Sequence, residues 1–219
     1  MPIAPKGRKG GKLARVVMPE GAIIEEQDLV AASRDGDVQA FDQLVLRYQQ
    51  MVYNLAYRML SDPESAADVS QDAFLSAFKE LRKFRGGSFK SWILRITANA
   101  CYDVLRRKQR RPTSSLDAML EDEDSPACFP NQGEGPEAAA LRRELLEGVK
   151  DGLLTLPPEQ RLVVILSDVQ GLAYEEIAQI TNSSLGTVKS RLSRGRVRLR
   201  DFLLRQPELL PSQFRPDSR

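Results

Sequence analysis

The sequence contains no histidine and only two cysteines, and both scarcities limit the chemistry open to it. Without histidine there is no Ser-His-Asp or Cys-His catalytic arrangement and no histidine-containing zinc site. Cys101 and Cys128 are too few for a zinc ribbon or a disulfide framework, and two free thiols fit a reducing cytosol. Composition alone leaves catalysis by carboxylates or lysines open.

Long apolar runs are missing as well. No stretch approaches the roughly 18 apolar residues of a transmembrane helix, and the basic N-terminus lacks the apolar core of a signal peptide. We therefore expect a cytoplasmic protein with no membrane insertion. Residues 1–21 are interpreted as a basic, disordered tail, and the alternative is that the protein starts at Met18.

The net charge of only +2 conceals a strongly uneven distribution. Residues 81–112 contain ten basic residues and one acidic residue, and residues 184–205 contain seven and one. Residues 113–140 between them contain seven acidic residues and no basic residue. Two separate basic segments indicate polyanion binding at two places, although two solvated helix faces would show the same pattern.

The acidic stretch 113–140 is predicted to be a flexible linker. It contains Pro126, Pro130 and Pro136 and has too few apolar residues to form a core. It separates an N-terminal domain (22–112) from a C-terminal domain (141–205), and residues 206–219 form a tail. As a coil, such a linker spans about 30 Å on average and at most about 90 Å.

Both domains are predicted to be helical, so the fold class is all-α with two small helical domains. Apolar residues recur at steps of three and four over 38–60, the pattern of an amphipathic helix. Pro63 marks the start of a second helix that runs to about Leu81. Further helices are predicted over 89–108, Leu141–Leu154 and Glu159–Val169.

Residues 174–205 have the pattern of a helix-turn-helix. A short helix over 174–180 and a polar turn precede Ser184, a good N-cap for a longer helix. Its predicted buried stripe is Leu185, Val188, Leu192 and Leu199. Its polar face suits the major groove, and Arg196, Arg200 and Arg205 are candidates for phosphate contact. An arginine-rich solvated helix is the alternative.

Residues 81–112 combine positive charge with aromatic side chains, as in proteins that hold single-stranded bases by stacking and phosphate contact. Phe89, beside Gly86 and Gly87, is predicted to be exposed. Trp92 shares a stripe with Ile96, so core packing is an equally open interpretation for Trp92.

The preceding helix has an acidic and polar edge. Asp68, Gln71, Asp72 and Leu75 follow the i, i+3, i+4, i+7 spacing of one helix face. The other side, with Ala67, Phe74, Phe78 and Leu81, is predicted to be core. An acidic edge repels DNA and suits a basic protein partner, and a plain solvated face is the alternative.

Taken together, these segments resemble a known family. DVSQDAFLSAF (68–78) and FRGGSFKSWILRITANACYDVLRRKQRRP (84–112) resemble region 2 of bacterial sigma factors. LPPEQRLVVILSDVQGLAYEEIAQITNSSLGTVKSRLSRGRVRLRDFL (156–203) resembles region 4. Because no region 3 domain lies between them, the chain resembles the extracytoplasmic-function (ECF) group of the sigma-70 family.

The resemblance implies a promoter-specificity subunit that is not an enzyme and needs no cofactor and no metal. Its implied partners are core RNA polymerase (the beta and beta-prime subunits), promoter DNA and an anti-sigma factor. Two rival hypotheses remain: a stand-alone helix-turn-helix transcription factor, and a nuclease, for which the basic segment 81–112 offers one acid, Asp103.

The resemblance also assigns three sets of site residues. The polymerase-binding set is Asp68, Gln71, Asp72 and Leu75. The set that recognises and melts the −10 element is Arg85, Ser88, Phe89, Lys90, Trp92, Arg95, Asn99, Arg106 and Arg107. The set that reads the −35 element is Ser184, Thr187, Lys189, Ser190, Arg191, Arg194 and Arg198.

Overall fold

The computed structural model describes residues 25–110 and 135–206, and every regular element in these two ranges is a helix. The all-α prediction is therefore confirmed. The expected tail over 1–21, residues 113–134 of the expected linker and the tail from residue 207 lie outside the described residues, as do residues 22–24, 111 and 112. No helix within the described ranges is long and apolar enough to cross a membrane.

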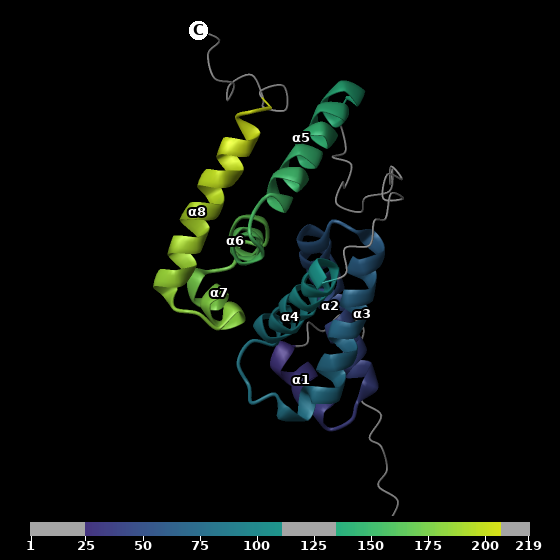
Figure 1. The fold of residues 1–219 in the computed structure, drawn as a ribbon. Helices are drawn as coiled ribbons and strands as arrows, with labels where there is room; N and C mark the ends of the chain where they lie inside the picture. Colours follow the sequence, from purple (N-terminus) through teal and green to yellow (C-terminus); the bar gives the residue numbers. More distant parts are fainter. Residues whose placement is uncertain (1–24, 111–134, 207–219) are drawn as a thin grey trace, which may run out of the picture.

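The N-terminal domain consists of four α-helices and one short 3₁₀ turn (Figure 1). They are α1 (Glu26–Arg34), α2 (Val38–Leu60), α3 (Pro63–Glu80), η1 (Leu81–Lys83) and α4 (Phe89–Arg110). The three helices predicted from periodicity are present at nearly the expected bounds. Helix α1 was not predicted, because its nine residues bury only Leu29, Val30 and Ser33.

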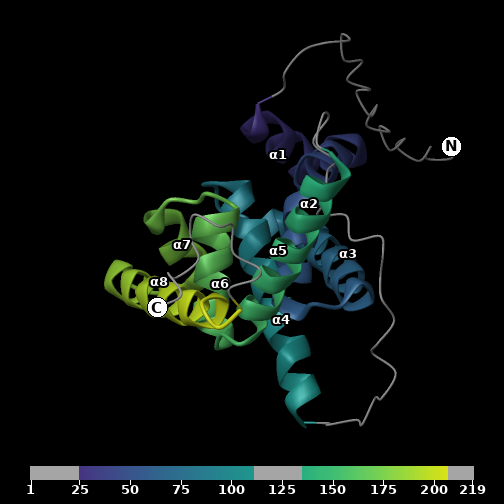
Figure 2. The same ribbon diagram turned by 90° about the horizontal axis from the view of Figure 1, so that it is seen from above.

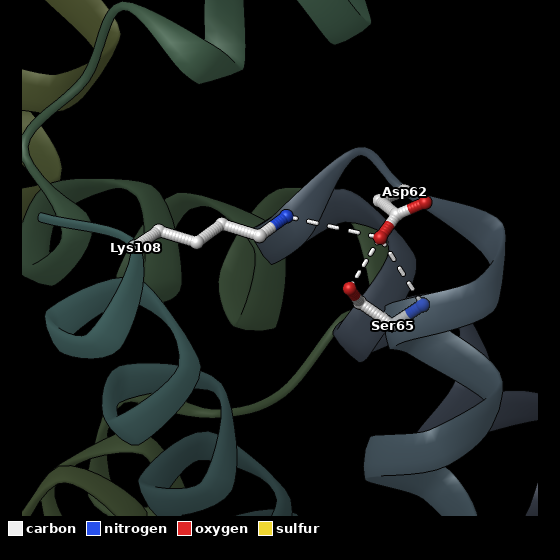
Figure 3. Close-up of polar contacts among 3 residues, drawn as sticks. All are labelled: Asp62, Ser65 and Lys108. Carbon is white, nitrogen blue, oxygen red and sulfur yellow. Dashed lines mark hydrogen bonds and ion pairs between the residues drawn. The ribbon is translucent and has the colours of Figure 1, made fainter. Parts of the chain in front are cut away.

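The turn from α2 into α3 is built around Asp62, as Figure 3 shows. Its carboxylate caps α3 by accepting hydrogen bonds from the Ser65 amide at 3.2 Å and from the Ser65 hydroxyl. The hydroxyl bond is the main reason that the pKa of Asp62 is lowered. Lys108, near the end of α4, lies 3.7 Å from the same oxygen. Both partners are exposed to solvent, so this ion pair contributes only about 0–1 kcal/mol.

The domain's own core contains a cluster of aromatic rings around Phe89. The Phe89 side chain is 0% exposed, and its ring centroid lies 5.7 Å from those of Tyr48 and Trp92 and 6.3 Å from that of Phe84. The prediction that Phe89 is exposed is wrong. Gly86 and Gly87, both at positive φ, turn the chain just before α4, and the first side chain of the helix lies against α2.

The predicted core side of α3 needs a similar correction. Phe74 and Leu81 are buried as expected, whereas Ala67 is exposed and Phe78 is 44% exposed. The residues that α3 buries are mostly small, which brings its backbone close to α2 and leaves Phe78 at the margin of the contact. There the Phe78 ring packs edge-on against Phe41, with centroids 5.0 Å apart.

The C-terminal domain consists of α5 (Pro136–Leu154), α6 (Pro158–Val164), the π-helical turn η2 (Ile165–Val169), α7 (Tyr174–Thr181) and α8 (Leu185–Leu203). Helix α5 begins at Pro136, five residues before the predicted start at Leu141. Proline suits the first helical position and the alanines that follow favour a helix. The Ser184 hydroxyl accepts a hydrogen bond from the Thr187 amide at 3.1 Å, which confirms the predicted N-cap of α8.

The two domains pack against each other through a shared apolar core. Helix α2 contacts α5, α6 and η2, and α4 contacts α7; Figure 2 shows α6 and α7 beside α4. One cluster of buried side chains joins residues of both domains: Leu55, Ala56, Met59, Leu94, Ala98, Cys101, Leu153, Leu156, Leu162, Ile165, Leu166 and Ile177.

Arg161 is the main polar link across this interface. Its guanidinium is buried and donates hydrogen bonds to the carbonyl of Met59 in α2 at 2.5 Å and to the carbonyls of Leu154 and Leu156 at 2.8 and 3.1 Å. Gln170 donates a second cross-domain bond to the Met51 carbonyl at 3.0 Å. Burial lowers the pKa of Arg161, and the three carbonyls replace part of the solvation that the charge has lost.

Phe89→Ala should lower the free energy of unfolding by about 3–5 kcal/mol, because it empties a fully enclosed aromatic site. The matched control is Phe78→Ala, which removes an edge-on aromatic contact and should cost about 0.5–1.5 kcal/mol. Urea unfolding followed by the fluorescence of Trp92, the single tryptophan, measures both changes. Equal losses would contradict the buried position of Phe89.

Gly195→Ala should destabilise the C-terminal domain. A Cβ at this position would lie 2.7 Å from Val164 Cγ2 in α6, and such overpacking costs about 1–3 kcal/mol. Gly186 lies in the same helix, but a Cβ there has no neighbour closer than the Ser184 hydroxyl at 3.8 Å. Gly186→Ala should therefore stabilise the helix, by up to about 1 kcal/mol. Thermal unfolding measured by circular dichroism should shift in opposite directions for the two variants.

Candidate nucleic-acid interface

Helix α8 presents its predicted polar face to solvent. Ser184, Lys189, Ser190, Arg194 and Arg198 are exposed, and Thr187 and Arg191 are partly buried. Val188 and Leu192 are buried on the opposite side and fix this orientation, as predicted. The predicted stripe is wrong at Leu185, the first residue of α8, which is 40% exposed.

The arginines of α8 divide into paired and unpaired groups. Arg196 donates two hydrogen bonds to the carboxylate of Asp168, at 2.9 and 2.5 Å, which raise its pKa. Arg200 is held by Asp201 at 2.8 Å. Arg194 donates to the backbone and side chain of Ser190. Within residues 25–110 and 135–206 no acid neutralises Arg194 or Arg198, so these two retain their full charge for a phosphate or a base.

The loop before α4 and the exposed side of α4 form the second basic surface. Arg85, Ser88, Arg95, Asn99, Arg106 and Arg107 are exposed, Lys90 and Trp92 are half-buried, and Phe89 does not reach the surface. The Ser88 hydroxyl accepts a hydrogen bond from the Ser91 amide at 3.2 Å and so caps α4. Arg106 makes an exposed ion pair with Asp103 at 3.4 Å.

A residue that sequence patterns did not single out also holds this helix start. Glu26 in α1 accepts a hydrogen bond from the Phe89 amide at 3.0 Å and another from the Tyr48 hydroxyl. No sequence signal marked it, since α1 itself was not predicted. Arg161 was missed as well, although a single arginine before the apolar run 162–166 was a usable signal.

The acidic edge of α3 is exposed as predicted. Asp68, Gln71 and Asp72 are exposed, and Leu75 between them is 48% exposed. Val69 and Ala73 face the core from the same turns. Among the residues that the structure describes, no ion pair involves Asp68 or Asp72. An exposed leucine beside unpaired carboxylates suits contact with a basic protein surface better than contact with nucleic acid.

The remaining reactive groups within the described residues form no cluster of metal ligands. Cys101 is buried, and burial raises the pKa of its thiol to about 12; Cys128 lies outside the described residues. In the part of the chain that the structure describes, no three His, Cys, Asp or Glu side chains are placed to hold a metal ion. Asp103, the acid of the nuclease hypothesis, pairs with Arg106.

Two family models match the chain in the order of its two domains. Residues 44–111 match sigma-70 region 2, and residues 147–199 match sigma-70 region 4. The first match covers α4, the loop before it and the acidic edge of α3, and the second covers the helix-turn-helix.

Curated relatives are similar to this chain over three quarters or more of its length. The RNA polymerase sigma-H factor of Pseudomonas aeruginosa is 38% identical over 178 residues, which cover 78% of this chain and 90% of the relative. The ECF RNA polymerase sigma-E factor of Escherichia coli K12 is 37% identical over 175 residues, 79% of this chain and 91% of the relative. The ECF RNA polymerase sigma factor SigE of Mycolicibacterium smegmatis is 39% identical over 165 residues, 75% of this chain but only 62% of the relative.

Solved structures agree. The sigma factor RpoE of Bartonella quintana, solved in complex with the anti-sigma factor NepR, has a TM-score of 0.59 at 29% identity and covers 76% of this chain and 98% of its own. CnrH, solved with the cytosolic domain of CnrY, has a TM-score of 0.61 at 26% identity, with 81% and 96% covered. With regions 2 and 4 matched in order and relatives similar over most of its length, the chain belongs to the ECF group of the sigma-70 family of RNA polymerase sigma factors.

Proposed function

We propose that the protein is a promoter-specificity subunit that binds core RNA polymerase, recognises the −10 and −35 promoter elements and helps to open the DNA. The observation that carries this proposal is the pairing of two unlike surfaces on one small domain. Helix α3 presents unpaired acids around an exposed leucine, and α4 with its loop presents basic side chains. A protein that only bound DNA would have no use for the acidic surface.

The −35 element would be read by α8. In a helix-turn-helix the second helix lies in the major groove, with its N-terminal residues at the base edges. Ser184, Thr187 and Ser190 occupy that end, and Arg194 and Arg198 follow along the exposed face. Unpaired arginines can donate two hydrogen bonds to guanine or bind phosphate.

The −10 element would be held by the loop before α4 and by the exposed side of α4. Arg85, Ser88, Arg95 and Asn99 are the exposed polar side chains available for bases and phosphates. Phe89 takes no part in base stacking in this proposal, because its ring is enclosed. The buried Phe89 ring supports the loop by packing against Phe84 and Trp92.

Asp68, Gln71, Asp72 and Leu75 on α3 would dock on a basic surface of core polymerase. Complementary charges steer and orient such an encounter. RpoE of Bartonella quintana was solved in complex with an anti-sigma factor, which makes a proteinaceous inhibitor a further candidate partner for this chain. Co-purification from the native host would identify it.

Binding both promoter elements at once requires the two domains to separate. Tyr102 of α4 is close enough to Arg191 of α8 and Glu159 of α6 for their charges to act on its pKa, which burial chiefly raises to about 12. The −10 and −35 elements, in contrast, lie more than one helical turn of DNA apart, a turn being about 34–36 Å. The chain between Arg110 and Pro136 can extend to roughly 80 Å, so it permits the movement.

Run-off transcription with purified core polymerase and genomic promoter fragments tests the function directly. The protein should direct specific initiation and should bind duplex DNA only weakly without polymerase, because each contact surface is small and gains from being linked. The stand-alone transcription factor predicts the reverse: tight binding to duplex DNA alone and no association with core enzyme.

Arg194→Ala and Arg198→Ala should each weaken binding of the holoenzyme to −35 duplex DNA. If the lost contact is to a base, the binding free energy should weaken by about 1–3 kcal/mol. If it is to a phosphate, the slope of log K against log salt concentration should fall in magnitude by about 1. The matched control is Arg196→Ala in the same helix, since Arg196 is already paired with Asp168. Titrations at several salt concentrations measure all three, and an equal loss for Arg196→Ala would contradict the assignment.

Dyes on the two domains should move apart when a promoter is bound. Gln43→Cys in α2 and Asp151→Cys in α5 place the labels at exposed positions. Cys128, which lies outside the described residues, is replaced by serine so that it takes up no dye. Cys101 can stay, because a buried thiol reacts poorly. Energy transfer should be high in the free protein and should fall in the polymerase–promoter complex. Unchanged transfer on promoter binding would refute domain separation.

A further inference from the structure

The carboxylate of Glu26 connects α1 with its neighbour α2 and with α4, which lies much further along the sequence. Glu26 lies in the first turn of α1, and one of its oxygens accepts a hydrogen bond from the Phe89 amide at 3.0 Å. The other oxygen accepts a hydrogen bond from the hydroxyl of Tyr48 in α2. Tyr48 is buried, and its ring packs against that of Phe89 with centroids 5.7 Å apart. Glu26 therefore acts as a cap for α4 that is supplied by another helix.

The start of α4 needs such a partner. The first amides of a helix have no acceptor within the helix, and a negative charge near them is favourable. The hydroxyl of Ser88 satisfies the Ser91 amide from within the local chain. The Phe89 amide is satisfied by Glu26, across 63 positions of sequence. The beginning of α4 is thus held both locally and from α1.

The segment that this cap anchors is the loop between η1 and α4. Gly86 and Gly87 lie in it at φ of 95° and 93°, with nothing within 4 Å of where a Cβ would be. A glycine-rich loop loses much conformational entropy when it binds a ligand. It is anchored at one end by the buried ring of Phe84, which packs on Trp92 with centroids 5.0 Å apart. The amide of Phe89, bonded to Glu26, anchors the other end.

We propose that Glu26 is a positioning residue for −10 recognition: by capping α4 from α1 it holds the loop 84–88 and the first turn of α4 in the conformation that binds DNA. This inference rests on the proposed function. Glu26 acts through Phe89 and the loop rather than by touching DNA, because both of its oxygens are engaged with the protein. Preorganisation of this kind raises affinity by lowering the entropy lost on binding.

The variants are Glu26→Ala, which removes both acceptors, Glu26→Gln, which keeps an oxygen for the Phe89 amide, and Tyr48→Phe, which removes the second hydrogen bond. The matched control is Glu25→Ala. Glu25 is an exposed carboxylate one position earlier and its side chain caps nothing. All are made in the full chain and assembled with core polymerase.

The probes are two DNAs taken from one promoter found by run-off transcription. One is a fork-junction DNA in which the −10 element is single-stranded, and the other is a duplex that carries only the −35 element. Glu26→Ala should weaken binding to the fork about tenfold, the scale of a lost helix cap. It should leave −35 binding and affinity for core polymerase within about twofold of wild type. Glu26→Gln should restore most of the loss, Tyr48→Phe should fall between them, and Glu25→Ala should match wild type.

Hydrogen exchange of the free protein gives a second readout that does not involve DNA. Exchange in peptides covering residues 84–92 should be faster in Glu26→Ala, while α8 should be unchanged. Normal fork binding by Glu26→Ala overturns the positioning role and leaves the proposed function intact. A parallel loss of fork, −35 and polymerase binding also overturns it, by showing only general destabilisation. If the wild-type holoenzyme does not bind the fork, the proposed function itself is wrong.

Discussion

Helix α4 packs against other helices on several sides at once, and this constraint determines where the basic surface of the N-terminal domain can lie. Ile93 and Thr97 lie in the interior of its own domain, and Leu94, Ala98 and Cys101 belong to the core shared with the C-terminal domain. Only one strip of α4 is therefore left for polar residues. Arg95 and Asn99 lie on that strip, so the burial of the remaining faces fixes where the basic surface can be.

Exposed acidic and exposed basic side chains are kept apart in this protein because they lie on different helices. The exposed acids of α3 and the exposed bases of α4 belong to one domain, yet they lie on two different helices that pack against each other. In α8, internal pairing with Asp168 and Asp201 occupies Arg196 and Arg200 and leaves Arg194 and Arg198 unpaired among the described residues. The small net charge of +2 therefore results from acidic and basic surfaces whose charges nearly cancel.

Helices with a long apolar stripe and a clear cap could be predicted from sequence. Pro63 begins α3 and Ser184 caps α8 as expected, and residues 38–60 form one helix. Helix α1 could not be found in this way, because a nine-residue helix with three buried positions has little periodicity. Phe89 was misjudged because loop flanks are usually exposed, whereas here a ring just after two glycines is enclosed by Tyr48, Phe84 and Trp92.

The sequence by itself determined the helical class, the two domains, the helix-turn-helix and the residue types on each surface, because these depend on local periodicity and composition. The tertiary structure decided which of those residues are available. It enclosed Phe89, paired Arg196 with Asp168, joined the domains through Arg161 and brought Glu26 to the start of α4. Each of these outcomes depends on at least one contact between residues 28 to 102 positions apart, and no local pattern encodes contacts over such separations.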